Sequence, residues 1–331
     1  MYIVTGASGL IGSAVVWALN KRGIEDIIAV DHLGTSEKWK NLRALKFSDY
    51  HEKDAFRKLI LENKFDPARI KAILHIGACS STTEKDASYL ADNNFAYTKE
   101  LAEFADKNSI RFLYASSSAT YGDGANGFVD DEESLEKLRP LNMYGYSKQI
   151  FDLWAKNKGL LKRIAGLKFT NVFGPGEYHK GDMRSVVIKS FEQVKDSGKI
   201  KLFKSYIPEY QNGNQMRDFL YVKDAVDMAL FIMENKNING IFNIGSGRAE
   251  TWNSLANAVF SAVNQQPVIE YVAMPEHLKD KYQYYTKAEM GKLRSFGYAK
   301  ECRSLQDSVG DYVKNYLIPN RYLGDSDSES K

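Results

Sequence analysis

Tyr2-Ile-Val-Thr-Gly-Ala-Ser-Gly-Leu-Ile-Gly12 is the stretch of sequence that decides the fold. It opens with a short apolar run typical of a strand buried on both faces, and its glycines follow the spacing G-x-x-G-x-x-G. An apolar helical pattern continues to Leu19, and residues 27–31 predict a second buried strand. Strand, glycine turn, helix and strand in this order predict a dinucleotide site, because the turn and the helix N-terminus suit a pyrophosphate.

The candidate cofactor-binding residues in this stretch are Gly6, Gly9, Gly12 and Asp31. An acid that ends the second strand ~20 residues after the turn meets the adenosine ribose in such folds. Taken alone, Asp31 favours NAD, because a carboxylate repels the 2′-phosphate of NADP. His32 and Lys38 lie nearby and are able to hold that phosphate, so these residues leave the choice open. The alternative for the whole stretch is a glycine-rich turn in an unrelated α/β protein.

The composition excludes several other classes of protein. The chain has 331 residues, 44% of them hydrophobic, and a net charge of +3 without a dense basic run, so we expect no nucleic-acid partner. No apolar run approaches the ~20 residues of a membrane helix, and the first residues predict a strand rather than a signal peptide. Cys79 and Cys302 make neither a disulfide framework nor a metal cluster. We therefore expect no metal and a cytoplasmic location.

Alternating strands and helices from the first residue to about Leu113 predict an α/β fold with a doubly wound, mostly parallel sheet. The other strands predicted for it are 72–76, 111–116, 164–169 and 241–244. The expected domains are a Rossmann domain at 1–174 with returns near 215–247, a smaller, interleaved, mainly helical substrate domain at 175–214 and 248–320, and a disordered tail at 321–331.

Tyr144 and Lys148 lie four residues apart at the start of a predicted helix, so they share a face. A tyrosine, with a pKa near 10, is a poor base at neutral pH. A lysine ammonium one turn away and the charge of an oxidised nicotinamide favour the phenolate and lower that pKa. Tyr144 then takes a hydroxyl proton while hydride leaves the same carbon. Ser117 ends a predicted strand, where its hydroxyl can bind the same substrate oxygen.

The glycine turn, Ser117, Tyr144-x-x-x-Lys148 and Arg217-Asp-Phe-x-Tyr-Val-x-Asp224 occur together. In this combination the chain resembles the extended short-chain dehydrogenase/reductase family, in particular its nucleotide-sugar epimerases. The resemblance runs to about Leu317, and Gly77-Ala-Cys-Ser-Ser-Thr-Thr83 is its most specific piece. It implies an isomerase that takes a hydride from one sugar carbon and returns it to the opposite face. It also implies one tightly bound NADP per subunit, an ADP-heptose substrate and a homo-oligomer.

The resemblance implies roles for residues along most of the chain. The implied cofactor contacts are Leu10, Ile11, Asp31, His32, Lys38, Lys53, Ile76, Gly77, Ala78, Cys79, Ser80, Asn93, Lys148, Val172 and Lys180. The implied substrate contacts are Ser117, Asn171, Lys189, Arg217 and Tyr282. The implied acid/base residues are Tyr144 and Lys180, assisted by Lys148 and Ser117.

The chain departs from the family pattern at two places on the sugar side. Asp182 stands where a serine is usual, and Phe203-Lys204-Ser205 stands where Phe-Glu-Gly is usual. We keep Asp182, Phe203, Lys204 and Ser205 as candidate substrate-binding residues.

Ordinary alternatives exist for three of the implied site residues. Lys180 is a solvated loop lysine by default, and only the resemblance gives it a role. Arg217 suits a bidentate clamp on the substrate diphosphate, or else forms a surface ion pair with Asp218. Cys79 has no activating histidine or basic residue beside it in the sequence, so a small residue lining the cofactor is favoured over a nucleophile.

Three other functions compete with ADP-heptose epimerisation. A nucleotide-sugar epimerase or reductase for another sugar, such as a UDP-glucose 4-epimerase, would share the same motifs. A nucleotide-sugar dehydratase carries an Asp-Glu pair just after the strand-end hydroxyl, where this chain has Ser118 and Ala119. A non-catalytic dinucleotide sensor would need no Tyr144–Lys148 pair.

Overall fold

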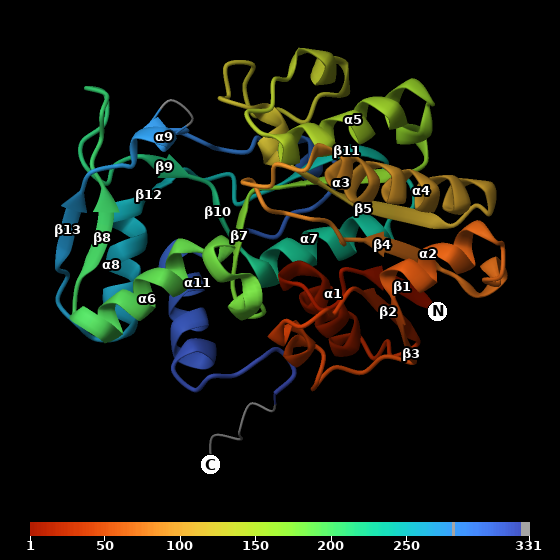
Figure 1. The fold of residues 1–331 in the computed structure, drawn as a ribbon, viewed down its shortest axis with the longest axis horizontal. Coiled ribbons are helices and arrows are strands. Elements are labelled where there is room, and N and C mark those ends of the chain that lie inside the picture. Colours follow the sequence, from red (N-terminus) through yellow and green to blue (C-terminus); the bar gives the residue numbers. More distant parts are fainter. Residues whose placement is uncertain (280–281, 326–331) are drawn as a thin grey trace.

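The structure is a computed structural model that describes residues 1–279 and 282–325 (Figure 1). At its centre is a parallel sheet of seven strands in the order β11-β6-β5-β4-β1-β2-β3. The strands are β1 Tyr2–Thr5, β2 Ile27–Asp31, β3 Asp49–Glu52, β4 Ala72–His75, β5 Arg111–Ser117, β6 Ala165–Phe169 and β11 Gly240–Ile244. The predicted doubly wound α/β fold is confirmed.

The inner strands of this sheet are apolar because both of their faces are covered. Every residue of the inner strands β2, β4, β5 and β6 and of the edge strand β11 is buried, whereas β3 at the opposite edge has a polar sequence and no buried residue. Tyr2 of β1 lies opposite Ile27 on one side and Ala72 on the other. The strand order therefore reverses beside β1, which is where sheets of this type bind their ligands.

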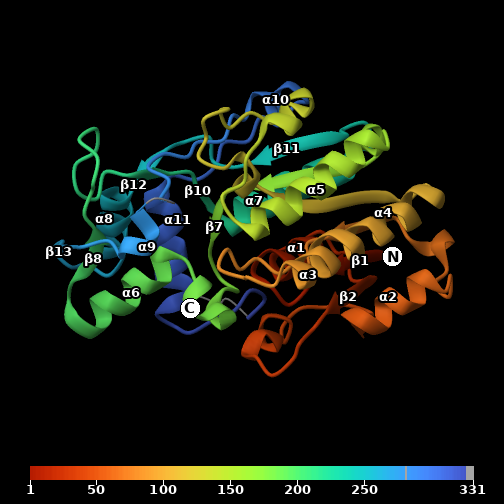
Figure 2. The ribbon, with the colours of Figure 1, turned by 45° about the horizontal axis from the view of Figure 1, so that its top comes forward.

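Helices cover the sheet in two layers (Figure 2). α1 (Leu10–Lys21) packs against α7 (Val222–Glu234) on one face. The other face is covered by α2 (Lys53–Leu61), α4 (Tyr97–Lys107) and α5 (Met143–Asn157), and each layer has its own apolar core. α3 (Ala87–Leu90) leads into a π-helical turn at Ala91–Ala96 before α4 begins. The segment 91–107 is thus α-helical only from Tyr97 onward.

A second lobe lies beside the carboxyl edge of the sheet (Figure 1). Its strands pair two by two: β8 (Ile200–Phe203) with β13 (Ile269–Val272), and β9 (Met216–Arg217) with β12 (Glu250–Thr251). Its helices are α6 Val186–Ser197, α8 Trp252–Ala262, α9 Glu276–Lys279 and α11 Leu305–Tyr312. α10 (Gly291–Ser295) contacts β11 of the large sheet. The pair β7 (Asn171–Phe173) and β10 (Phe219–Tyr221) connects the two lobes.

We propose the sequence-based division into two domains for these two lobes. α7 and β11 return to the large sheet, whereas β9, within the same expected return, pairs with β12. The remaining helical turns are η1 Glu37–Asn41, η2 Pro67–Arg69, η4 Ser118–Tyr121, η5 Glu132–Lys137, η6 Leu160–Lys162, η7 Tyr178–Met183 and the π-helical η8 Val313–Leu317. Among the described residues, no helix has the length and apolarity that a membrane crossing requires.

The disordered tail expected at 321–331 is wrong for residues 321–325. Tyr322 and Leu323 are buried, and the Asp325 carboxylate forms an ion pair with Arg43. The expectation rested on the polar composition of the last residues. Two apolar side chains at the beginning of the range, Tyr322 and Leu323, are buried against the rest of the protein. Residues 326–331 lie outside the described part of the chain.

Candidate active site

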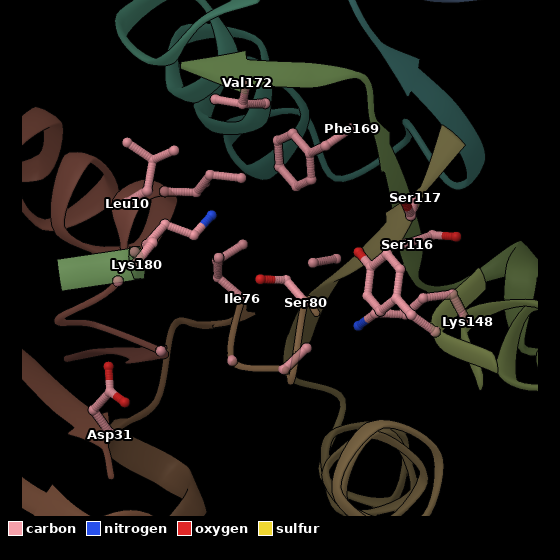
Figure 3. Close-up of a pocket in the computed structure, with 18 of the residues that line it drawn as sticks. Leu10, Asp31, Ile76, Ser80, Ser116, Ser117, Lys148, Phe169, Val172 and Lys180 are labelled. Atoms are coloured by element: carbon pink, nitrogen blue, oxygen red, sulfur yellow. The ribbon is translucent and has the colours of Figure 1, made fainter. Parts of the chain in front are cut away.

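A cavity of about 280 Å³ lies at the carboxyl edge of the sheet, between the glycine turn and the second lobe (Figure 3). Its lining residues are Gly6, Gly9, Leu10, Ile11, Gly12, Asp31, Lys38, Ile76, Gly77, Ala78, Ser80, Ala115, Ser116, Ser117, Tyr144, Lys148, Phe169, Thr170, Val172, His179 and Lys180. The fold thus brings all four candidate catalytic residues to the same cavity as most of the candidate cofactor residues.

The glycine turn allows an approach that a side chain would prevent. Gly6 has φ +64°, and a Cβ on it would lie 2.6 Å from the Cα of Gly77, which follows β4. α1 begins at Leu10, its N-cap Gly9 provides no side-chain cap, and its first turn contains no acid. The N-terminus of this helix therefore faces the cavity with its backbone N–H groups and positive dipole end. These groups fit the pyrophosphate of a dinucleotide.

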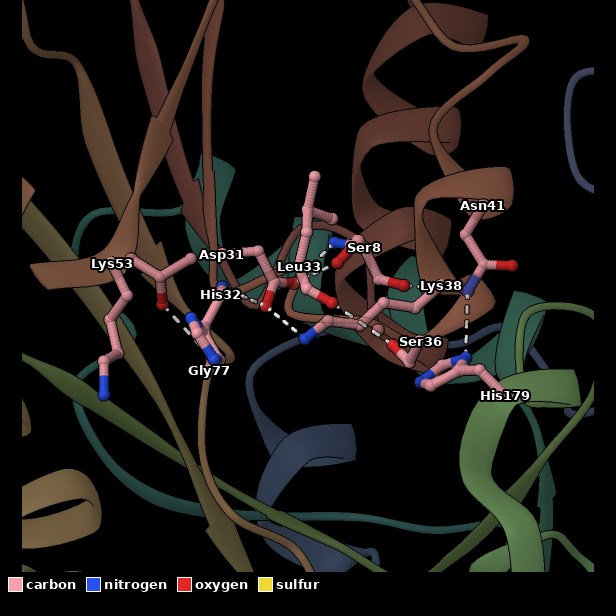
Figure 4. A network of polar contacts seen from close by, with 12 residues as sticks. Ser8, Asp31, His32, Leu33, Ser36, Lys38, Asn41, Lys53, Gly77 and His179 are labelled. Atoms are coloured by element: carbon pink, nitrogen blue, oxygen red, sulfur yellow. Dashed lines mark hydrogen bonds and ion pairs between the residues drawn. The ribbon is translucent and has the colours of Figure 1, made fainter.

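The Asp31 carboxylate is fully engaged by protein groups (Figure 4). Its Oδ2 accepts hydrogen bonds from the Ser8 amide at 2.8 Å and the Ser8 hydroxyl at 2.5 Å. Its Oδ1 accepts from Lys38 Nζ and from the His32 amide, each at 2.7 Å. Lys38 therefore neutralises the carboxylate charge that would repel a phosphate.

A second hollow of about 140 Å³ adjoins the first, and Gly6, Asp31, Lys38, Gly77 and Ala78 line both. It gathers the other candidate cofactor residues: His32, Lys53, Cys79 and Asn93. Lys53 Nζ donates to Asn93 Oδ1 at 3.0 Å, and the exposed His32 ring contacts Glu52 at 3.2 Å. The two hollows thus meet at Asp31 and Lys38 and together bring the candidate cofactor residues of both into one region.

Asn94 is a site residue that sequence reasoning did not single out. Its Oδ1 accepts from the Cys79 amide at 2.8 Å, and its Nδ2 donates to the Cys79 carbonyl at 2.9 Å and to Ser147 Oγ at 3.0 Å. One side chain thus fixes the loop after β4 to α5, next to Lys148. The π-helical turn shifts Asn94 away from its regular α-helical position, and no residue in it signals that turn.

Tyr144 and Lys148 lie on the first turns of α5, which Asn142 caps by accepting the Gly145 amide at 2.8 Å. The Lys148 side chain is buried, and its ammonium has no hydrogen bond or ion pair to any described residue. Burial lowers the pKa of Lys148 to about 8, although Asp152 opposes this shift. Burial raises the pKa of Tyr144, and a hydrogen bond with Ser117 offsets part of the rise.

The expected lowering of the Tyr144 pKa is therefore wrong for the protein alone. The expectation rested on two positive charges, that of an oxidised nicotinamide and that of Lys148. The protein alone supplies only the charge of Lys148. Desolvation of the phenolate outweighs what the protein's own groups provide.

Beneath this pair lies a completely buried ion pair in the sheet. Lys168 Nζ on β6 donates to Asp152 Oδ2 at 2.8 Å and to Thr120 Oγ1 at 2.6 Å. Asp152, one turn after Lys148 on α5, also accepts from the hydroxyls of Tyr114 at 2.9 Å and Ser116 at 2.8 Å. The network holds α5 on the sheet at the level of the candidate catalytic residues.

Lys180 enters the cavity from the side opposite Lys148 (Figure 3). It lies on η7, and its burial lowers its pKa, which nearby Glu177 partly restores. It is therefore a half-buried residue of the cavity wall rather than a fully solvated loop lysine. The buried Glu177 carboxylate anchors this loop by accepting from Ser185 Oγ at 2.8 Å and the Gly174 amide at 3.2 Å.

Asn41 ties this loop to the glycine turn. Its Nδ2 donates to the carbonyls of Ser8 and Gly176, both at 2.8 Å. His179, also absent from the sequence-based candidates, lies 3.5 Å from the same nitrogen, and burial lowers its pKa to about 4. The loop of Lys180 thus rests on the segment that would bind the pyrophosphate.

Arg217 in the second lobe is buried without an acidic partner among the described residues. Its guanidinium lies 5.1 Å from the Tyr282 ring and 5.7 Å from the Trp252 ring. The alternative of an ion pair with Asp218 is wrong, because the Asp218 carboxylate accepts hydrogen bonds from Ser246 and from backbone amides instead. A buried guanidinium held by aromatic rings fits an anionic ligand.

Of the candidate substrate residues, Ser117 lines the catalytic cavity, whereas Arg217 and the rest do not. Lys189 Nζ donates to the Asp182 carbonyl at 2.6 Å, and Asn171 Nδ2 donates to the Asp218 carbonyl at 3.3 Å. Phe203, Lys204 and Ser205 lie at the end of β8. Tyr282 accepts a hydrogen bond from Trp252 Nε1 at 2.9 Å, beside Arg217.

Further cavity residues were missed although a positional signal existed. Ala115 and Ser116 lie near the end of β5, Phe169 ends β6, and Thr170 follows it. Both strands were predicted, and the carboxyl ends of parallel strands meet at the ligand edge.

Comparison with known proteins identifies relatives along nearly the whole chain. The NAD dependent epimerase/dehydratase family matches residues 2–245. A Nitratidesulfovibrio vulgaris protein named ADP-L-glycero-D-manno-heptose-6-epimerase is 53% identical over 317 residues, covering 96% of this chain and 98% of the relative. A Fusobacterium nucleatum protein of the same name is 48% identical over 327 residues, with coverage of 96% and 98%. The solved structure of the Helicobacter pylori protein of that name has a TM-score of 0.78 at 21% identity, covering 95% of both chains.

Proposed function

The chain belongs to the NAD dependent epimerase/dehydratase family, and on that premise we propose that it interconverts ADP-D-glycero-D-manno-heptose and ADP-L-glycero-D-manno-heptose. Relatives at 53% and 48% identity over nearly the full chain carry the name of this activity. The observation in the structure that carries the proposal is one cavity lined by Tyr144, Lys148 and Lys180, in which Lys148 and Lys180 lie on opposite sides (Figure 3). The product would serve lipopolysaccharide core assembly.

Inversion at C6 of the heptose requires breaking a C–H bond that is not acidic. Proton abstraction needs a neighbouring carbonyl, and the unoxidised sugar has none at that carbon. A nicotinamide held between the glycine turn and Lys148 would supply the alternative, a group that can accept a hydride from a sugar carbon and return it to the opposite face. The protein must then remove a proton from the C6 hydroxyl and give it back.

Tyr144 is positioned to take that proton. Ser117, which hydrogen-bonds Tyr144, can hold the same hydroxyl. Among the described residues, the Lys148 ammonium has no partner that would compete with the phenolate for it. The ketone presents opposite faces in the two half-reactions, so one fixed tyrosine does not serve both poses. Lys180, from the opposite wall, is the second acid/base residue in this proposal, and its lowered pKa eases proton release.

We further propose NADP as the cofactor, because Lys38 neutralises Asp31 and because His32 and Lys53 lie beside it. The Lys38→Ala protein should lose affinity for NADP far more than for NAD. Lys40→Ala is the matched control, because Lys40 lies on the same turn but pairs with Glu37. Equal losses of both affinities in Lys38→Ala would show that Lys38 does not bind the 2′-phosphate.

Arg217 would bind the diphosphate of the nucleotide sugar, with Tyr282 and Trp252 beside it. A dehydratase would need a carboxyl group near the reacting carbon. Asp31 is the one acid among the described residues lining the main cavity, and Lys38 holds it. A dinucleotide sensor would not need the buried, unpaired Lys148. We propose a cytoplasmic homo-oligomer.

The experiment that tests the reaction follows C6 in heavy water. The purified protein, with its bound cofactor, converts ADP-D-glycero-D-manno-heptose in D₂O, and NMR reads deuterium at C6 of the product. Hydride that returns from the cofactor does not exchange with solvent, so the product should carry no deuterium there. Stoichiometric deuterium would overturn the hydride route, and no conversion of ADP-heptose alongside conversion of a UDP-sugar would reassign the substrate.

A further inference from the structure

Two segments that the proposed function uses lie side by side on the same wall of the active site. The segment 37–45 carries Lys38, which faces the expected 2′-phosphate, and η7 (Tyr178–Met183) carries Lys180. Both are irregular loops without the support of a sheet. Asn41 joins the glycine turn to the loop before η7 on the cavity side. The outer side of both segments is covered by residues 321–325.

Residues 321–325 contact η7 through Tyr178. The Tyr178 hydroxyl donates to the Arg321 carbonyl at 2.8 Å. The rings of Tyr178 and Tyr322 meet edge to face with centroids 4.8 Å apart. Lys180 follows Tyr178 by two residues, so these contacts fix the base of its side chain.

The same five residues contact segment 37–45 through Arg43. The Arg43 guanidinium forms a bidentate pair with Asp325, at 2.6 Å and 3.3 Å, and lies 4.6 Å from the centroid of the Tyr322 ring. The Tyr322 amide donates to Asp325 at 2.8 Å, which closes a turn around Gly324. Gly324 has φ +86°, and a Cβ on it would lie 2.8 Å from Leu45, so the turn sits directly on the segment.

We propose that residues 321–325 form a clasp that positions Lys38 and Lys180 together, with Arg43, Tyr178 and Tyr322 as positioning residues. Tyr322 is the shared element, because one ring contacts both Tyr178 and Arg43. Loss of Arg43, which holds the Tyr322 ring, would therefore alter the 2′-phosphate contact and the second acid/base residue at once. The inference rests on the proposed function, which gives Lys38 and Lys180 their roles.

The test compares Arg43→Ala with Arg163→Ala in the complete protein. Arg163 forms an equivalent bidentate pair with Asp106, at 2.5 Å and 3.1 Å, far along the chain from the clasp. We expect Arg43→Ala to weaken NADPH binding by about fivefold, the scale of one partly exposed ion pair, while NADH binding changes less. It should also lower kcat at saturating substrate, and Arg163→Ala should do neither.

Tyr178→Phe and Tyr322→Phe distinguish a positioning role from a role in folding. Each variant keeps the aromatic ring and its packing and loses only the hydroxyl. Tyr322→Phe should behave as the unmodified protein, whereas Tyr178→Phe loses the bond to Arg321 and should lower kcat without changing the NADPH-to-NADH affinity ratio. A clasp that only stabilises the fold would lower the melting temperature in Arg43→Ala and leave both the affinity ratio and kcat unchanged. That outcome would overturn the proposal.

Hydrogen exchange distinguishes failure of the clasp from failure of the proposed function. In the cofactor-bound protein, Arg43→Ala should speed amide exchange in 37–45 and in 177–183 together. If amide exchange speeds up in both segments while Lys38→Ala leaves the NADPH-to-NADH affinity ratio unchanged, that result would support the clasp and reject the cofactor assignment. Faster exchange in only one of the two segments would reject the clasp itself.

Discussion

Two buried cations, one in each lobe, have opposite surroundings. Lys168 in the large sheet is fully buried and paired with Asp152, whose remaining acceptor positions bind two hydroxyls. Arg217 in the second lobe is almost as buried, at 8% exposed, yet lies against aromatic rings with no acid among the described residues. Burying an unpaired charge is costly, so a protein that keeps one has a use for it. Lys168 holds α5 on the sheet, whereas Arg217 is the residue that we propose to bind a ligand.

Of the substitutions that test this comparison, we expect Lys168→Met to have the largest effect on stability. Asp152 would be left as a buried carboxylate without a cation, so the free energy of unfolding should fall by about 3–5 kcal/mol. Urea denaturation measures it. Adding Asp152→Asn removes the remaining charge and should recover part of the loss. If Lys168→Met unfolds at the urea concentration of the unmodified protein, Lys168 does not have the structural role assigned here.

Substitutions at the cavity should lower turnover without this loss of stability. Tyr144→Phe and Lys180→Ala should each reduce kcat by roughly a hundredfold or more, the scale of one acid/base group. Tyr146→Phe is the control, because Tyr146 lies on the same helix turn but is 58% exposed. Steady-state kinetics with ADP-heptose gives the values. Full activity in Lys180→Ala would remove only the second acid/base residue from the mechanism.

Arg217→Met tests the other half of the comparison. KM for the nucleotide sugar should rise about ten- to hundredfold, because charged hydrogen bonds contribute ~1.5–3 kcal/mol, while kcat changes little. The free energy of unfolding should stay the same or rise, in contrast to Lys168→Met. Arg217→Lys keeps the charge but not the bidentate geometry, so its KM should lie between those of Arg217→Met and the unmodified protein. A large loss of stability with an unchanged KM would make Arg217 structural.

The smallest effect concerns Lys148, a third buried cation and one that has no partner in the described part of the chain. Its pKa is lowered to about 8 in the folded protein, and an unfolded lysine titrates near 10.4. The folded state therefore binds fewer protons between these values, so stability rises with pH across this window. In protein freed of nucleotide, Lys148→Met should raise Tm at pH 7 by about 2–4 °C.

This Lys148→Met advantage should be complete below pH 8 and should disappear as pH approaches 10.5. Calorimetry at several pH values measures it. An advantage that stays constant up to pH 10.5 would come from better packing of methionine and not from the buried charge.

The sequence predicts the large sheet well because local and tertiary signals agree there. β1, β2, β4, β5 and β6 are apolar runs that both faces of the sheet bury, and each ends near a polar or glycine residue at the ligand edge. The edge strand β3 has a polar sequence and gave no such signal. β9 and β12 have two residues each, too few for any periodic pattern.

The residues of the candidate site likewise fall into those that the sequence predicts and those that it does not. Gly6, Ser117, Tyr144 and Lys148 are recognisable because fixed spacings place them on neighbouring elements. Among the described residues, Arg217 has no carboxylate partner because the neighbouring Asp218 side chain points away from it. Adjacent residues of an extended chain point to opposite faces. The packing of Tyr322 likewise depends on Tyr178 and Arg43, which lie more than a hundred residues away in the chain. No local pattern carries such information.

Asn41 has a consequence for the energetics of the whole reaction. Its amide holds the loop of Lys180 down on the glycine turn, and the main cavity lies between those two segments. We expect a nucleotide in that cavity to leave only when the loop lifts, and its exchange with the surrounding pool to be slow as a result. The proposed epimerisation has no need of exchange, since each borrowed hydride is returned within one cycle. The direction of the reaction is then set by the relative concentrations of the two sugars, independently of the redox state of the cell.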